Sequence, residues 1–187
     1  MPDGDLHLFP SGVSPDLVAA VEALLFAAGD PTTTAQLAAA LDADPAQVKL
    51  ALHALATLRE RPTSGVTLEE VAGGWQLRTA ARFGGAVLRL RGTKPSRLSR
   101  ASVEVLALVA YRQPVTRHEL EQLRGVDSGG VVKSLLDRGL IRVAGRRDEP
   151  GKPLEYRTTP AFLELFALSD LGDLPTLRER SDLDGQG

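Results

Sequence analysis

The same sequence pattern occurs twice in this chain of 187 residues. VEALLFAAGD-PTTTAQL (21–37) aligns with VEVLALVAYRQPVTRHEL (103–120) once a gap of one residue is allowed. The matched residues include Val21 with Val103, Leu24 with Leu106, Pro31 with Pro114, Thr33 with Thr116, Leu37 with Leu120, Val48 with Val131 and Leu52 with Leu135. Because these are core and capping positions, the repeat predicts two units of the same architecture.

Each copy predicts three helices followed by a β-hairpin. In the first copy, the helix starts are Ser14-Pro15, the capping box Thr33–Gln36 and Asp44-Pro45. The apolar period changes after Gly65, which predicts a hairpin over 66–77 that turns at Gly73-Gly74. In the second copy, the starts are Ser99, the capping box Thr116–Glu119 and Ser128, the strands are 140–143 and 154–157, and a last helix begins at Thr159-Pro160.

Three helices followed by a two-stranded hairpin is the winged-helix order, with the hairpin as the wing. We therefore predict a mainly α fold with small β-hairpins, built as two tandem winged-helix domains. The predicted segments are a flexible N-terminal arm (1–13), an N-terminal winged-helix domain (14–92), a linker (93–98), a C-terminal winged-helix domain (99–168) and an acidic, disordered tail (169–187). Each domain is small, so we expect shared packing or dimerisation to bury enough apolar surface.

Charge is distributed unevenly along the chain. Residues 94–160 hold 13 Lys and Arg against 8 Asp and Glu, whereas both flanking segments are acidic. The middle segment is therefore the only candidate for an anionic partner. The absence of cysteine excludes disulfides and thiolate metal sites and fits a reducing compartment. The apolar runs are too short for a membrane span, so no membrane partner is expected.

The stretch GRRDEPGKP (145–153) approaches a phosphate-binding loop but departs from it twice. Five residues rather than four separate Gly145 from Gly151, and Pro153 stands where a hydroxyl residue is required. Pro153 also lacks the N–H that a phosphate needs, and the residues after it predict a strand instead of a helix. Nucleotide binding is therefore not expected, and no cofactor is predicted.

DNA binding is the stronger alternative for the same stretch. Five cationic residues that could contact phosphates lie there: Arg142, Arg146, Arg147, Lys152 and Arg157. Asp148, Glu149 and Glu155 partly cancel their charge. The third helix of each copy, which would read bases in such a fold, is poor in Arg and Asn. Sequence-specific reading is therefore not expected, while weak, non-specific DNA binding stays open.

Catalysis and metal binding find little support in the residues. The three histidines, His7, His53 and His118, are scattered, and no paired ligand spacing accompanies them. Ser128 precedes two glycines, but no nucleophile-elbow motif surrounds it. We predict no catalytic, metal-binding or cofactor-binding residues, and no enzyme.

Three stretches resemble the segregation and condensation protein B family. They are VEALLFAAGDP (21–31), VAYRQPVTRHELEQLRGVDS (109–128) and LLDRGLIRVAGRRDEPGKPLEYRTTPAFLELFAL (135–168). The resemblance covers roughly residues 15–175. Two departures are Ala167, where the family usually has glycine, and Gly129-Gly130, which loosen the third helix.

The resemblance implies a non-enzymatic subunit of the bacterial SMC condensin-like complex, acting in chromosome condensation and segregation during cell division. It implies a homodimer, formed largely through the N-terminal domain, that binds the kleisin ScpA and reaches the SMC ATPase through it, in the cytoplasm at the nucleoid. The C-terminal domain would contact the kleisin, through candidates Tyr111, Arg112, Gln113, Arg117, Arg146, Arg147, Asp148 and Tyr156. The alternative is a winged-helix DNA-binding transcriptional regulator.

Overall fold

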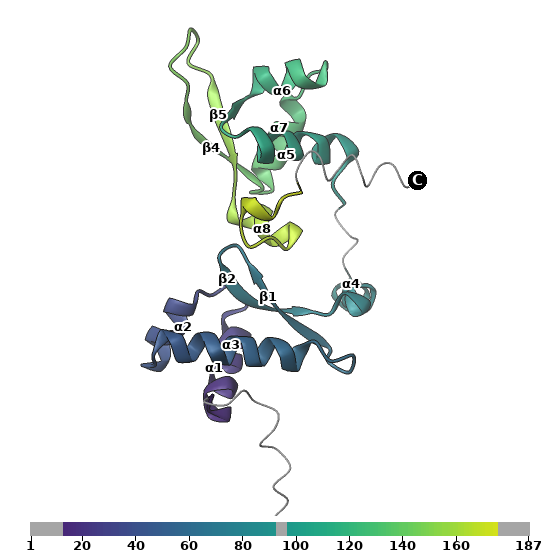
Figure 1. Ribbon diagram of the computed structural model, residues 1–187. Coiled ribbons are helices and arrows are strands. Elements are labelled where there is room, and N and C mark those ends of the chain that lie inside the picture. The colour runs from purple at the N-terminus through teal and green to yellow at the C-terminus, as the bar shows by residue number, and fades with distance from the viewer. Residues whose placement is uncertain (1–12, 93–96, 176–187) are drawn as a thin grey trace, which may run out of the picture. The chain divides into compact units, whose positions relative to one another are not determined.

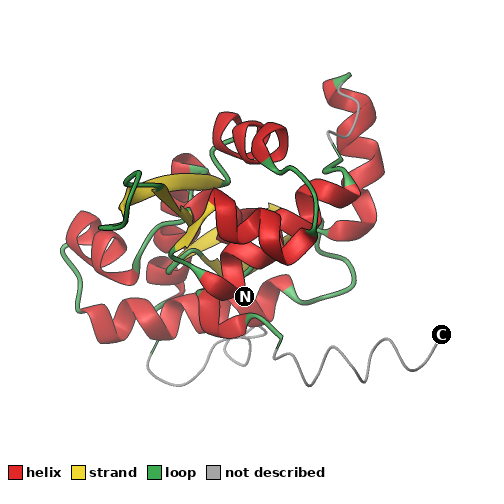
Figure 2. Cartoon of the chain, turned by 90° about the horizontal axis from the view of Figure 1, so that it is seen from above, coloured by secondary structure: helices red, strands yellow, loops and turns green. Residues whose placement is uncertain are grey.

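The computed structural model describes residues 13–92 and 97–175 (Figure 1). It divides into two compact units, Met1–Lys94 (unit 1) and Pro95–Gly187 (unit 2), and each is described by itself. The predicted N-terminal arm up to residue 12, most of the predicted linker and the predicted tail beyond Pro175 lie outside the described residues. Helices dominate the described chain, and its strands form short antiparallel sheets (Figure 2), so the mainly α fold with small β-hairpins is confirmed.

Unit 1 has three helices, a hairpin and a fourth helix. The elements are α1 (Pro15–Ala28), α2 (Thr34–Leu41), α3 (Pro45–Arg59), β1 (Val66–Val71), β2 (Gly74–Thr79) and α4 (Gly84–Arg91). The predicted helix starts are confirmed, including the reciprocal capping box between Thr33 and Gln36. Helix α4 was not predicted, because none of its residues is buried and its sequence lacks an apolar period.

The core of unit 1 lies between the first three helices and the hairpin. The fully buried side chains come from α1, α2, α3 and β1: Val21, Leu25, Leu37, Val48, Leu52, Leu55 and Val71. Thr32, in the loop between α1 and α2, pairs with Trp75 of β2 through two backbone hydrogen bonds of 2.9 Å. This bridge fixes the loop to the second strand of the hairpin.

Unit 2 repeats the three helices and the hairpin, with an additional short strand and a final helix. Its elements are α5 (Arg100–Arg112), β3 (Val115–Thr116), α6 (Arg117–Arg124), α7 (Gly129–Asp137), β4 (Ile141–Arg146), β5 (Leu154–Thr158) and α8 (Pro160–Phe166). The sheet has the order β3-β5-β4, so the predicted hairpin is confirmed and β3 is an unpredicted third strand. Thr116 and Glu119 form the predicted capping box of α6.

The core of unit 2 extends beyond the predicted end of its domain. Val105, Leu106, Val109, Leu120, Leu135 and Ile141 form its centre, and Leu168 and Leu174 pack against this cluster from the chain that follows α8. Leu171–Asp173 forms a 3-10 turn, and the Tyr111 hydroxyl donates a hydrogen bond of 2.6 Å to the carbonyl of Pro175. The first residues of the predicted tail, up to Pro175, are therefore folded onto unit 2.

Candidate protein-binding surfaces

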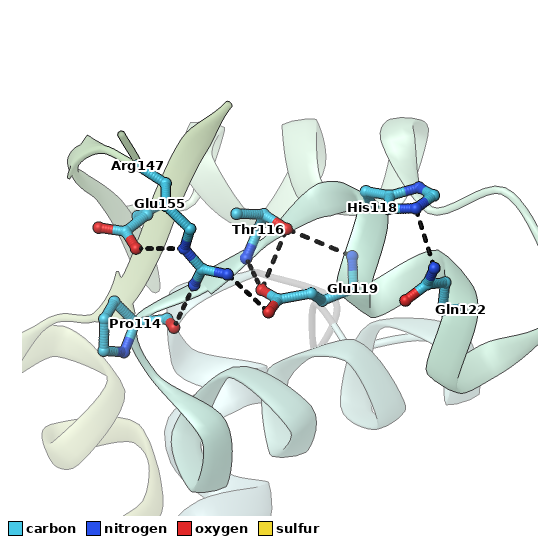
Figure 3. Close-up of polar contacts among 7 residues, drawn as sticks. All are labelled: Pro114, Thr116, His118, Glu119, Gln122, Arg147 and Glu155. Atoms are coloured by element: carbon cyan, nitrogen blue, oxygen red, sulfur yellow. Dashed lines mark hydrogen bonds and ion pairs between the residues drawn. The ribbon is translucent and has the colours of Figure 1, made fainter. Parts of the chain in front are cut away.

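A network around Arg147 joins the hairpin of unit 2 to the start of α6 (Figure 3). The guanidinium donates to Glu155 Oε1 at 2.8 Å, to Glu119 Oε1 at 2.7 Å and to the Pro114 carbonyl at 3.2 Å. Glu119 is the third residue of α6, and its Oε2 accepts the Thr116 backbone N–H at 2.7 Å. The capping box therefore holds the carboxylate in the position that Arg147 needs.

These contacts shift the pKa values of Glu119 and Arg147. The hydrogen bonds from Arg147 and from the Thr116 backbone lower the pKa of Glu119 to about 2. Hydrogen bonds with Glu119 and Glu155 raise the pKa of Arg147 above its ordinary value. Arg147 is consequently a charged side chain that is bonded within its own unit, which argues against its predicted contact with a partner.

Arg117, the first residue of α6, is also bound to carboxylates of its own unit. It pairs with Glu121 at 2.6 Å and with Asp127, and its pKa is raised mainly by the hydrogen bond with Glu121. A side chain at Gly129 would overlap the guanidinium, because an added Cβ would lie only 2.6 Å from Arg117 Cζ. Arg117 is half-exposed, so one side of the guanidinium still faces solvent.

The end of α5 holds three predicted contact residues, with different roles. Gln113 Oε1 accepts hydrogen bonds from the backbone and the hydroxyl of Thr158, at 2.9 and 3.1 Å, so it fixes α5 to β5. Tyr111 and Arg112 line a groove of about 390 Å³, the α5–α6 groove, whose other residues are Glu104, Ala107, Leu108, Leu123 and Arg124. The structure thus brings Tyr111 and Arg112 together on one surface.

The remaining candidates lie on or beside the hairpin. Tyr156 is only 6% exposed and belongs to the core, so the structure does not place it where a partner could bind it. Arg146 and Asp148 are exposed near the hairpin tip, where Arg146 donates a hydrogen bond to the Lys152 carbonyl. These three residues do not join the surface formed by Tyr111 and Arg112.

A second groove on unit 2 was missed by the sequence analysis. This α5–α8 groove has a volume of about 420 Å³ and is lined by Val103, Leu106, Ala107, Ala110, Tyr111, Phe162, Phe166, Leu168, Leu174 and Pro175. It shares Ala107 and Tyr111 with the α5–α6 groove. Two signals pointed to it: small residues spaced along one face of α5, and Phe166 at the last position of α8.

Unit 1 carries a comparable surface, the α1 groove, of about 670 Å³. It is lined by Ala19, Glu22, Ala23, Leu25, Phe26, Gly29, Val66, Leu77, Arg78 and Thr79, from α1 and the hairpin. Phe26, one of these lining residues, is 82% exposed and lies off the core face that Val21 and Leu25 form. An aromatic side chain left in solvent beside an apolar groove is typical of a protein-binding surface.

The described residues contain no group of three or more His, Asp or Glu side chains positioned to hold a metal ion. Among the same residues, no helix has the length and apolar character needed to cross a membrane. The described surfaces therefore offer mainly apolar grooves and surface charges for binding.

Comparison with known proteins gave a consistent result. The family model described as "Segregation and condensation complex subunit ScpB" matches residues 19–177. A segregation and condensation protein B of Syntrophotalea carbinolica is 54% identical over 168 residues, covering 90% of this chain and 85% of the relative. The Myxococcus xanthus protein of the same name is 48% identical over 163 residues, covering 87% of this chain and 50% of that protein. A solved structure described as a dimer of the ScpB N-terminal domain complexed with ScpA peptide is 33% identical, covers 40% of this chain and 94% of its own, and superposes with a TM-score of 0.39.

Proposed function

The chain belongs to the segregation and condensation protein B family, and on that premise we propose that it is a non-enzymatic scaffold subunit of a chromosome-organising complex. In this role the chain forms a homodimer and binds the kleisin ScpA, which in turn links it to the SMC ATPase. The proposed place of action is the cytoplasm, at the nucleoid. Membership of a family described as a segregation and condensation complex subunit supports this role.

We infer that both units are winged-helix domains. Each has three helices followed by an antiparallel hairpin, and in each the residue after the repeat's proline pairs with the second hairpin strand. Thr32 pairs with Trp75 in unit 1, and Val115 pairs with Tyr156 in unit 2. Equivalent pairings at aligned positions support a common architecture for the two copies.

The dimer contact is assigned to the α1 groove of unit 1. Phe26 is a large apolar side chain that the unit leaves 82% exposed. A symmetric contact would place Phe26 of each copy against the α1 groove of the other copy, since self-complementary surfaces are the rule in two-fold dimers. Burial of two aromatic side chains in this way would contribute apolar area that a small domain cannot bury internally.

The kleisin contact is assigned to the surface of α5. The observation that carries this assignment is that two grooves meet on α5 and share Ala107 and Tyr111. Apolar grooves on both sides of one helix fit the apolar face of an amphipathic segment from a partner. Arg112 lies at the rim of the α5–α6 groove and is exposed, so it can pair with an acidic residue of that segment.

Co-expression with the kleisin of the same organism tests both assignments. Ala107→Arg places a long charged side chain between the two grooves, and we expect it to abolish kleisin capture while the homodimer persists. Phe26→Asp is expected to give a monomer in light scattering. Ala39→Arg, at an exposed position on α2, is the matched control and should change neither result.

Three outcomes would contradict these assignments or the scaffold function itself. If Ala107→Arg still captures the kleisin at wild-type yield, the α5 surface is not the contact. Loss of the kleisin only in variants of unit 1 would move the contact there. If wild-type protein is monomeric and recovers no kleisin, the proposed scaffold function itself is wrong.

A further inference from the structure

Two arginines face each other across the hairpin of unit 2. The register pairs Arg142 of β4 directly with Arg157 of β5, and both side chains are exposed. Like charges at directly opposite positions of two strands destabilise the pairing. In the described part of the chain, neither arginine side chain has a hydrogen bond or an ion pair.

From this arrangement we propose that the β4–β5 hairpin binds the phosphodiester backbone of duplex DNA without reading its sequence. A phosphate between Arg142 and Arg157 would convert the repulsion into two charge-assisted hydrogen bonds. The binding site is new relative to the kleisin surface, because its residues lie on the sheet and not on α5. It stands beside the proposed scaffold function and does not depend on it.

The carboxylates that could neutralise the arginine pair are already bonded elsewhere. Glu155 is two residues from Arg157 on the same face of β5, but it pairs with Arg147. Arg147 also forms an ion pair with Glu119, the acidic residue at the start of α6. One arginine thus binds two carboxylates, so neither carboxylate is hydrogen-bonded to Arg142 or Arg157.

The hairpin carries cations on both of its faces. A bulge between Val143 and Gly145 shifts the alternation, so that Arg146 pairs with Leu154 and lies on the face opposite to the arginine pair. Lys152 follows at the turn, where its side chain is exposed. The hairpin extends beyond the helices of its unit (Figure 1), and a projecting two-stranded ribbon can enter a groove of DNA with a phosphate strand on each side.

The acidic residues at the tip limit where the backbone can lie. Asp148 and Glu149 are exposed in the turn and repel phosphate. The contact is therefore expected along the strands, over the roughly 13 Å that four residues of strand span between Arg142 and Arg146. Helix α7 is not the contact, because Lys133 is its only cationic residue.

Fluorescence anisotropy with a labelled 30-base-pair duplex and the full chain tests the proposal. Wild-type protein should bind duplexes of unrelated sequence equally well. With three phosphate contacts, one shared by Arg142 and Arg157 and one each from Arg146 and Lys152, its observed association constant should fall about 40-fold between about 50 and 200 mM salt. Arg142→Ala combined with Arg157→Ala should reduce this fall to about 10-fold, because the shared contact is lost. Arg100→Ala combined with Lys133→Ala removes the same charge from other parts of unit 2 and should leave the salt dependence unchanged.

Three results would overturn the proposal. Absence of binding in low salt, or equal losses in the two double variants, would show that the arginine pair is not a DNA site. Loss of binding only in the variant that lacks Lys133 would assign the contact to α7. If Arg142→Ala with Arg157→Ala abolishes kleisin capture and leaves DNA binding intact, the hairpin binds an acidic protein segment. Preserved capture of the kleisin by the same variant separates this test from that of the scaffold function.

Discussion

Replacing Gly74 by alanine should destabilise unit 1 strongly, although the change adds a single methyl group. Gly74 is buried at the start of β2, beneath the loop between α1 and α2. A Cβ at this position would lie 2.9 Å from the backbone nitrogen of Thr32 and 3.0 Å from the carbonyl carbon of Pro31. Both distances are well below ordinary carbon contacts of about 3.5 to 4 Å. The clashing atoms are backbone atoms, so no side-chain rotation can relieve the overlap.

The size of the destabilisation follows from the displacement of the loop between α1 and α2. The loop can retreat only by breaking or lengthening the two hydrogen bonds between Thr32 and Trp75, each worth about 1 kcal/mol net. Residual strain in the packed loop adds about 1 kcal/mol. We therefore expect the free energy of unfolding of unit 1 to fall by about 3 kcal/mol.

Urea unfolding followed by tryptophan fluorescence measures this change directly. Trp75 is the only tryptophan, and it belongs to the bridge itself, so its signal reports on unit 1 alone. With a slope of about 2 kcal/mol per molar urea, the midpoint should fall by about 1.5 M. Gly84→Ala is the control, since an added Cβ there meets nothing within 4 Å and the residue is already helical. If Gly74→Ala unfolds at the wild-type midpoint, the loop is not held against the hairpin as described.

Two further predictions concern unit 2. Glu119→Gln keeps a capping-box side chain but removes the charge that pairs with Arg147. Because the pKa of Glu119 falls from 4.5 to about 2 in the folded protein, its stabilising effect should be complete above about pH 5 and disappear as the pH falls through about 2. The carboxylate is 38% exposed, so we expect a loss of only about 1 kcal/mol at pH 7, seen in urea unfolding by circular dichroism, and a smaller loss at pH 3; an equal loss at both pH values would contradict the assignment. Gly130→Ala, in α7 with open space around the added Cβ, should stabilise unit 2 by about 0.5 kcal/mol in the same assay, and a destabilised variant would show that the start of α7 needs glycine.

Local signals in the sequence were sufficient for most elements of the fold. Capping residues and prolines at helix starts predicted most of the helices, and the change from helical to strand-like patterns predicted both hairpins. Helix α4 escaped prediction because it begins with two glycines and buries nothing. Strand β3 escaped because it has two residues and exists only through its pairing with β5. Neither element has a signal within its own residues, which is why single-sequence reasoning missed them.

The candidate site was harder to predict than the fold. The sequence showed which side chains were charged, but Arg147 and its partner Glu119 are 28 residues apart, and only the folded sheet brings them together. The burial of Tyr156 was easier to foresee: Leu154, Tyr156 and Thr158 lie on the same face of β5, and the apolar members of that alternation already indicated burial. The grooves on α1 and α5 depend on which apolar side chains the unit leaves uncovered, and the small residues of α5 were only an indirect signal of that.

Both copies of the repeat hold their hairpins by a backbone bridge, and unit 2 also uses an ion-pair network. That network connects the stability of the hairpin with its proposed binding of phosphate. In both, the loop after the first helix pairs with the second hairpin strand, through Thr32 and Trp75 or through Val115 and Tyr156. Unit 2 adds an ionic clamp, in which Arg147 binds two carboxylates. Because that clamp engages Glu155 and Glu119, neither carboxylate is hydrogen-bonded to Arg142 or Arg157, and the two arginines remain available to a phosphate. Protonation of Glu119 or its replacement by glutamine would free Arg147 from one partner, so the same change that weakens the hairpin should strengthen, and not weaken, its attraction for phosphate.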